Sequence, residues 1–124
     1  MSQWNVLVVE DEDDSMELVR GVLEYHQIES VGATNGEEAI AVLQTMALPT
    51  LIIVDLALPI IDGWGVLEFL KSNQKFAQIP RIAITAFHTP ELAYEVIAAG
   101  FDAYFPKPID STTFVRELER IVNN

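Results

Sequence analysis

Short, largely apolar runs recur along the chain, and each leads directly into a side chain that is capable of chemistry. The runs lie at residues 6–9, 51–54, 81–84 and 102–105. Apolar runs of this length, bounded by turn residues, are typical of strands that are buried on both faces. The first two runs lead into acids, the third into the hydroxyl of Thr85 and the fourth into a segment that carries the amine of Lys107. The pattern therefore predicts buried strands whose ends form one functional site.

The segments between these runs repeat apolar residues every three or four positions, which is the spacing of an amphipathic helix. The predicted helices begin near residues 14, 36, 63, 90 and 111, and the first extends to residue 26. Residues 28–34 alternate weakly and predict an edge strand. The apolar positions expected to face inward are Met16, Val19, Val22, Leu23, Ala39, Ile40, Leu43, Met46, Val66, Phe69, Leu70, Leu92, Val96, Ala99, Phe114, Leu118 and Ile121.

Residues that favour helix ends mark the later helices. Thr89 followed by Pro90 is typical of a helix start, and Gly100 is typical of a helix end. We expect Asp110 or Ser111 to cap the last helix, because the short polar side chains of Asp and Ser accept hydrogen bonds from the first free N–H groups.

The segment 10–14 consists entirely of acids and precedes the first helix. We expect Asp13 or Asp14 to cap that helix, with Glu17 completing a capping box. Capping does not explain the first two acids of the segment, which follow directly after a buried strand.

The alternation of strands and helices predicts an α/β fold with a parallel sheet and helices on both of its faces. Five strands suit the doubly wound order 2-1-3-4-5, in which ligands bind beyond the carboxyl ends of the first and third strands. The sequence places Glu10, Asp11 and Asp55 at that crevice, and Thr85 and Lys107 follow on the next strands.

The composition is that of one globular domain, which we expect to cover residues 1–124. Half of the residues are hydrophobic, which is enough for a substantial core. No apolar stretch approaches the roughly 20 residues of a membrane span, and residues 1–5 lack the features of a signal peptide. The absence of cysteine fits a cytoplasmic protein. The net charge of −12 argues against direct binding of nucleic acid, whose phosphates attract Lys and Arg.

Three carboxylates held together at the crevice would repel one another. A pair about 4 Å apart costs roughly 4 kcal/mol at an effective dielectric of about 20. Either one carboxylate is protonated or a hard divalent cation such as Mg²⁺ neutralises the cluster. With Thr85 and Lys107 nearby, such a site could stabilise a phosphoryl group during transfer, and Asp55 would be the nucleophile.

These residues, in this order and spacing, resemble a response-regulator receiver domain over essentially the full length of the chain. The resemblance implies a flavodoxin-like fold of five strand–helix units. The matching residues are Glu10, Asp11, Asp55, Pro59, Asp62, Gly63, Thr85, Ala86, Tyr104, Lys107 and Pro108.

The resemblance also implies how the acids work. Asp55 would accept a phosphoryl group from a sensor histidine kinase or a histidine phosphotransfer protein. Asp11 and Asp55 would bind Mg²⁺ directly, Glu10 would bind it through water, and the backbone carbonyl of Ala57 would complete the protein ligands.

Other roles implied by the resemblance lie on the last two strands. Thr85 and Lys107 would hold the phosphoryl oxygens, and a cis peptide bond before Pro108 would orient Lys107. Tyr104 would turn inward as Thr85 moves towards the phosphate. Such a protein catalyses only its own phosphoryl transfer and slow autodephosphorylation, and is not otherwise an enzyme.

The expected output is a change in protein contacts, in a monomer or weak dimer without direct contact to membrane or nucleic acid. The downstream protein target would bind the face formed by the helix from Pro90, the strand at 102–105 and the helix from about residue 111. The chain ends at Asn124 directly after that helix, so we expect either a stand-alone regulator or a receiver from a longer protein. Ala57 and Phe87 cannot orient an attacking water, which predicts a long-lived phosphoryl group.

Two other functions deserve comparison. An aspartate-nucleophile phosphatase commonly carries an acid two residues after the nucleophile, where this chain has Ala57. A degenerate receiver would bind partners without phosphorylation, but the acceptor, Thr85 and Lys107 are all retained.

Overall fold

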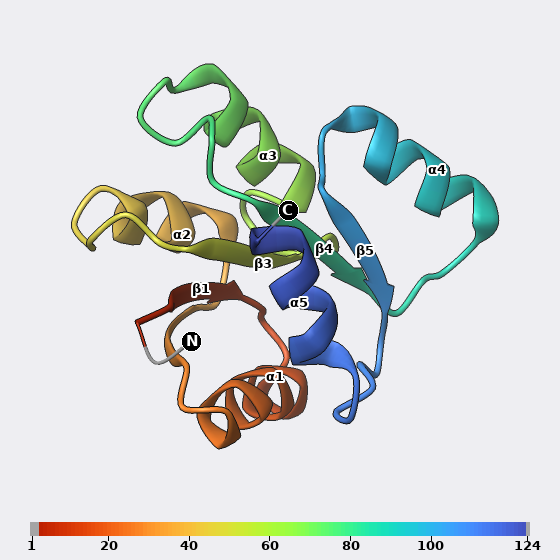
Figure 1. Cartoon of the computed structure of the whole chain (residues 1–124). Coiled ribbons are helices and arrows are strands. Elements are labelled where there is room, and N and C mark those ends of the chain that lie inside the picture. Colours follow the sequence, from red (N-terminus) through yellow and green to blue (C-terminus); the bar gives the residue numbers. More distant parts are fainter. Residues whose placement is uncertain (1–2, 124) are drawn as a thin grey trace.

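The computed structural model describes residues 3–123, and its helices and strands alternate throughout (Figure 1). The predicted bounds of the domain include Met1, Ser2 and Asn124, which lie outside the described residues. The strands are β1 (Asn5–Val9), β2 (Glu29–Ala33), β3 (Leu51–Asp55), β4 (Arg81–Thr85) and β5 (Ala103–Pro106). The helices are α1 (Asp13–Tyr25), α2 (Gly36–Leu43), α3 (Gly63–Ser72), α4 (Pro90–Ala99) and α5 (Phe114–Val122).

The strands form one sheet in the order β2-β1-β3-β4-β5, and all neighbouring strands are parallel. This result confirms the predicted doubly wound, flavodoxin-like fold and the edge position of β2. Val9 of β1 pairs with Val54 of β3. The residues that follow this pair therefore leave the sheet side by side at its carboxyl edge.

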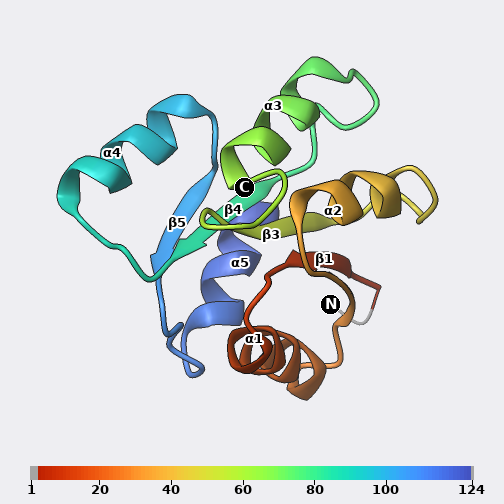
Figure 2. The ribbon, with the colours of Figure 1, turned by 180° about the vertical axis from the view of Figure 1, so that it is seen from behind.

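Helices cover both faces of the sheet, as Figures 1 and 2 show from opposite sides. Along β3, Ile52 and Val54 pack with residues of α2, α3 and α4, whereas Leu51 and Ile53 pack with residues of α1 and α5. Every residue of β3 is buried. A strand covered on both faces needs apolar residues at consecutive positions, which explains the uninterrupted run in the sequence.

The caps of the middle helices follow their local sequence. The hydroxyl of Thr89 accepts the N–H of Leu92 at the start of α4, and Gly100 has a φ of 129° after its end. The side chain of Asp62 accepts the N–H of Gly65 at the start of α3. None of the described helices has the length and apolar composition to cross a membrane.

The predicted cap of α1 is wrong. The helix begins at Asp13, so Asp13 and Asp14 lie in its first turn, and Glu12 occupies the N-cap position without a side-chain hydrogen bond. The carboxylate of Glu10 accepts the N–H of Glu12 at 3.1 Å and thereby ties the start of the helix to the end of β1. The two aspartates stabilise the positive end of the helix dipole instead of capping it.

The predicted cap of α5 is also wrong. The helix begins at Phe114 after an N-cap at Thr113, and a turn separates it from Asp110. The side chain of Asp110 accepts both the N–H and the hydroxyl of Thr112, at 2.9 and 2.6 Å. Asp110 therefore stabilises the turn before the helix, while its backbone carbonyl accepts the N–H of Phe114.

Candidate functional site

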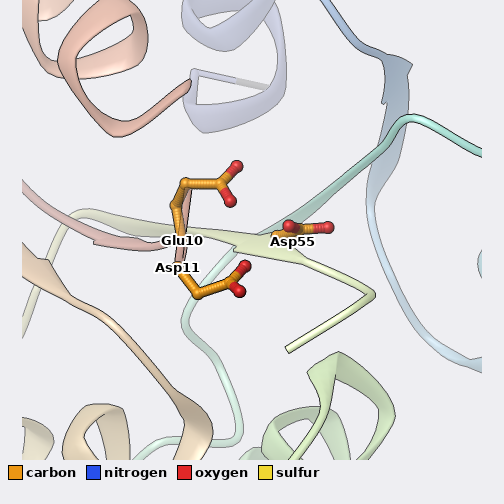
Figure 3. A group of neighbouring side chains, drawn as sticks. All are labelled: Glu10, Asp11 and Asp55. Atoms are coloured by element: carbon orange, nitrogen blue, oxygen red, sulfur yellow. The ribbon is translucent and has the colours of Figure 1, made fainter. Parts of the chain in front are cut away.

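Three carboxylates converge at the carboxyl edge of the sheet. Glu10 and Asp11 follow β1, and Asp55 is the last residue of β3. One carboxylate oxygen from each residue lies within 4.8 Å of the other two, and Figure 3 shows the three side chains extending from neighbouring strand ends. The structure therefore brings together the acids that the strand pattern assigned to one crevice.

The three acids differ in their exposure to solvent. Glu10 is fully buried and the exposed fraction of Asp55 is 3%, whereas Asp11 is exposed. Two adjacent buried carboxylates require a counter-charge or a proton. Asp11 provides a ligand atom at the entrance, where an ion could arrive from solvent.

Lys107 supplies that counter-charge. Its Nζ lies 2.7 Å from Oε1 of Glu10 and 3.2 Å from Oδ2 of Asp55. The family resemblance implies that Lys107 holds the oxygens of a phosphoryl group, but no pattern in the sequence predicts that the same amine bridges two acids. One ammonium offsets only part of the charge of three carboxylates, so the site favours a further cation.

The two buried carboxyls have pKa values that are shifted in opposite directions. Burial and the hydrogen-bonded, negatively charged Glu10 together raise the pKa of Asp55 from 3.8 to about 6, against smaller opposing effects of the Ala57 N–H and Lys107. Burial also acts to raise the pKa of Glu10, but hydrogen bonds with Lys107, Asp55 and the Glu12 N–H outweigh it and lower that pKa. When this pair binds a proton, Asp55 is therefore the group that holds it.

The loop between β3 and α3 folds tightly against the site. Oδ1 of Asp55 accepts the N–H of Ala57 at 3.1 Å. A Cβ added to Gly63 would lie 2.7 Å from the backbone oxygen of Asp55, so only glycine fits there. Ile60, 72% exposed, has a φ of 69°, which is strained for a β-branched residue. No feature of the neighbouring residues predicts this left-handed conformation.

Thr85 and Lys107 are connected through the backbone. Thr85 ends β4 with an exposed fraction of 1%, and its carbonyl accepts the N–H of Lys107 at 2.8 Å. The peptide bond between Lys107 and Pro108 is cis. The hydroxyl of Thr85 accepts the N–H of Phe87 at 3.1 Å. Its own proton remains available to a ligand oxygen.

Tyr104 is not hydrogen-bonded to the acids. It lies on β5, partly buried against the apolar cluster beneath α3 and α4. Its hydroxyl lies 2.7 Å from Nδ1 of His88, in the loop before α4. No pattern in the sequence pairs His88 with Tyr104, because the two residues are 16 positions apart.

Comparison with known proteins identifies the family. Residues 6–119 match the model of the response regulator receiver domain. The chain therefore belongs to the response-regulator receiver family, a family of two-component signalling regulators rather than conventional enzymes. Its acidic cluster of Glu10, Asp11 and Asp55 is typical of the Mg²⁺ site of such domains.

Individual relatives agree over nearly the whole chain. The chain is 32% identical to the polar-differentiation response regulator DivK of Brucella anthropi, over 93% of each protein. A putative response regulator from Chloroflexus aurantiacus has a TM-score of 0.91 and 26% identity, over 98% of each chain. The receiver domain of a signal transduction histidine kinase from Syntrophus aciditrophicus has a TM-score of 0.86 and 27% identity, over 97% of this chain and 90% of that one.

Proposed function

We propose that this protein is a phospho-accepting switch in which Asp55 receives a phosphoryl group from a sensor histidine kinase or a histidine phosphotransfer protein. The observation that carries the proposal is the position of Asp55, which shares one pocket with two further acids and with the amine of Lys107. Receiver-family membership implies a histidine kinase partner. We further propose that residues 1–124 form one receiver domain that works in the cytoplasm.

The transfer needs only the carboxylate of Asp55 as nucleophile. One carboxylate oxygen forms a bond to phosphorus while the bond from phosphorus to the donor's imidazole nitrogen breaks, and that nitrogen keeps the electron pair. No base is required, because the reactive form of Asp55 carries no proton. The amine of Lys107 can follow the negative charge from the carboxylate to the incoming phosphoryl oxygens.

The donor atoms of the pocket fit Mg²⁺, which prefers carboxylate and carbonyl oxygens and keeps some of its waters. In our proposal Asp11, Asp55 and the Ala57 carbonyl hold the ion directly, and Glu10 holds it through water. When bound, the ion would offset the negative charge of the phosphoryl oxygens. The exposed position of Asp11 supports its role as a direct ligand.

The switch would follow from the charge that the phosphoryl group adds, about −1.5 to −2. We propose that this charge attracts Thr85 and Lys107 and that Tyr104 moves as a result. The face formed by α4, β5 and α5 would then change its affinity for a downstream protein. On α4, Tyr94 and Ile97 are 78% and 49% exposed, which supports a protein-binding role for this face.

Acetyl phosphate tests the proposal without knowledge of the kinase. With Mg²⁺, we expect the intact mass of the protein to show a single hydroxylamine-labile phosphoryl adduct, which Asp55→Ala abolishes. Asp11→Asn should lose Mg²⁺-dependent labelling. Asp13→Asn is the matched control, because it removes an exposed acid of the same segment that lies on α1 rather than in the cluster.

Each other outcome has a distinct meaning. Failure to form an adduct with acetyl phosphate and with phosphorylated kinase would favour the degenerate receiver. Turnover of a phosphomonoester would favour the phosphatase. Both Ala57 and Phe87 are exposed and apolar. The adduct should therefore persist after the donor is removed, and its rapid loss in pure protein would contradict the predicted long lifetime.

A further inference from the structure

The loop between β4 and α4, residues 86–89, is attached at both of its ends. At the first end, the N–H of Phe87 donates to the buried hydroxyl of Thr85 at 3.1 Å. At the other end, Thr89 caps α4 by accepting the N–H of Leu92 at 3.0 Å. Only the short stretch between these anchors, which contains His88, links Thr85 to the helix.

His88 attaches the middle of this loop to β5. Its Nδ1 lies 2.7 Å from the hydroxyl of Tyr104, and the two rings pack with their centroids 5.4 Å apart at an angle of 37°. Burial raises the pKa of Tyr104, so its phenol keeps its proton at neutral pH and can donate it to a neutral imidazole. The contact thus combines a hydrogen bond with ring packing.

The contacts form a continuous path from Thr85 to Tyr104. A displacement of the Thr85 hydroxyl must either move the Phe87 amide or break its hydrogen bond. Either change alters the backbone directly before His88 and therefore the position of its imidazole. The ring of Phe87 does not restrain the loop, because it is 71% exposed.

We propose that His88 is a positioning residue that couples Tyr104 to the loop, so that a movement of Thr85 reaches Tyr104 through the Phe87 amide and the His88 imidazole. The inference rests on the proposed function, in which Thr85 contacts the phosphoryl group. In this proposal His88 transmits the movement of the loop to Tyr104, whereas Asp55 and Lys107 act in the phosphoryl transfer itself.

Carbon-13 labelling of the tyrosine rings tests this coupling by NMR. The described tyrosines are Tyr25, Tyr94 and Tyr104, and Tyr25, which is 84% exposed and lies on α1 outside the α4–β5–α5 face, serves as the internal control. In the wild type, acetyl phosphate and Mg²⁺ should shift the Tyr104 resonance. In His88→Ala, the adduct should form at the wild-type rate, but most of that shift should be lost.

Two further variants separate coupling from structure. His88→Asn keeps a hydrogen-bond acceptor close to the position of Nδ1 and should restore much of the Tyr104 shift. Phe87→Ala keeps the amide that donates to Thr85 and should behave as the wild type does. The thermal midpoint of each variant is measured as well. If His88→Ala has the midpoint of the wild type, a loss of stability is excluded as the cause of the lost Tyr104 shift.

Two results would overturn the inference. The first is a full phosphorylation-dependent shift of Tyr104 in His88→Ala. The second is a Tyr104 resonance in unphosphorylated His88→Ala that is identical to that of the wild type, because the contact would then be absent in solution. Failure of the wild type to form any adduct would instead contradict the proposed function. The second comparison requires no phosphorylation and would still decide whether His88 positions Tyr104.

Discussion

Two basic side chains lie at opposite edges of the sheet, one at the start of β4 and one directly after β5, and these two cations have very different surroundings. Arg81 lies at the amino edge of the sheet and Lys107 at the carboxyl edge. The guanidinium of Arg81 donates to backbone carbonyls, at 2.8 Å to Ile79, 2.8 Å to Ala77 and 3.3 Å to Phe76. Its only acidic neighbour among the described residues, Asp102, is 4.0 Å away.

Lys107 instead faces an excess of acid. Its ammonium contacts Glu10 and Asp55, and Asp11 lies at the same pocket. Backbone carbonyls accept hydrogen bonds from Nε and from one Nη of Arg81, so neutral groups of the backbone hold this guanidinium in place. The carboxyl edge keeps a net negative charge, which a metal ion requires. It also holds an ammonium that can exchange one oxygen partner for another, which a phosphoryl group requires. Charge balance therefore distinguishes the structural cation, Arg81, from Lys107, which we propose to be the functional one.

Arg81→Met should produce the largest loss of stability. The variant removes the guanidinium donor from the carbonyls of Ile79 and Ala77 and one of the two donors to the carbonyl of Phe76, and we expect the free energy of unfolding to fall by about 3 kcal/mol. Urea denaturation measures the change, and labelling of Asp55 should survive at temperatures where the variant is folded. Lys75→Met is the control for removing an exposed cation nearby. A loss below about 1 kcal/mol would mean that water replaces the guanidinium.

Asp55→Asn should change the pH dependence of stability. The pKa of Asp55 is raised from 3.8 to about 6 in the folded state, so ionisation costs the folded protein stability as pH rises through that interval. In chelator at pH 7 the variant should exceed the wild type by on the order of 2–3 kcal/mol, and this gain should vanish below the unfolded pKa. Urea midpoints across the pH range measure it. Parallel profiles for the two proteins would contradict the raised pKa.

Ile60→Gly tests whether the carboxyl edge also stores backbone strain. A left-handed residue with a β-branched side chain costs roughly 1–2 kcal/mol, and glycine removes that cost at the expense of greater freedom in the unfolded chain. We expect a net gain of up to about 1 kcal/mol in the free energy of unfolding. Leu48→Gly, at an exposed position without a positive φ, should lose stability. A loss in both variants would show that Ile60 is not strained in solution.

Asp102→Asn should have the smallest effect. The carboxylate of Asp102 accepts the N–H of Arg81 at 2.9 Å, and an asparagine oxygen can accept the same bond. The side chain is 48% exposed and lies far from ideal ion-pair distance, so we expect a loss of about 0.5 kcal/mol or less. Thermal unfolding measures the shift. A loss as large as that of Arg81→Met would show that the ion pair, and not the carbonyls, holds the guanidinium.

Most of the fold could be predicted because the residues of each strand indicate whether that strand is buried and where it ends. The uninterrupted apolar residues of β3 indicate burial on both faces, and the acid at its end indicates the edge of the sheet. The N-cap of α4 was predictable for the same reason, since Thr89 and Leu92 are neighbours in sequence. The start of α1 was not predictable, because it depends on the carboxylate of Glu10, which lies in the site and accepts the N–H of Glu12.

The sequence by itself determined the alternation of strands and helices, the strand order and the set of acids at the carboxyl edge, because these depend on periodicity and on which side chains tolerate burial. Only the tertiary structure decided that Lys107 bridges Glu10 and Asp55 and that His88 contacts Tyr104. Glu10 and Lys107 are 97 residues apart. Contacts of that kind depend on distances and directions that exist only after the sheet has assembled, and no local pattern encodes them.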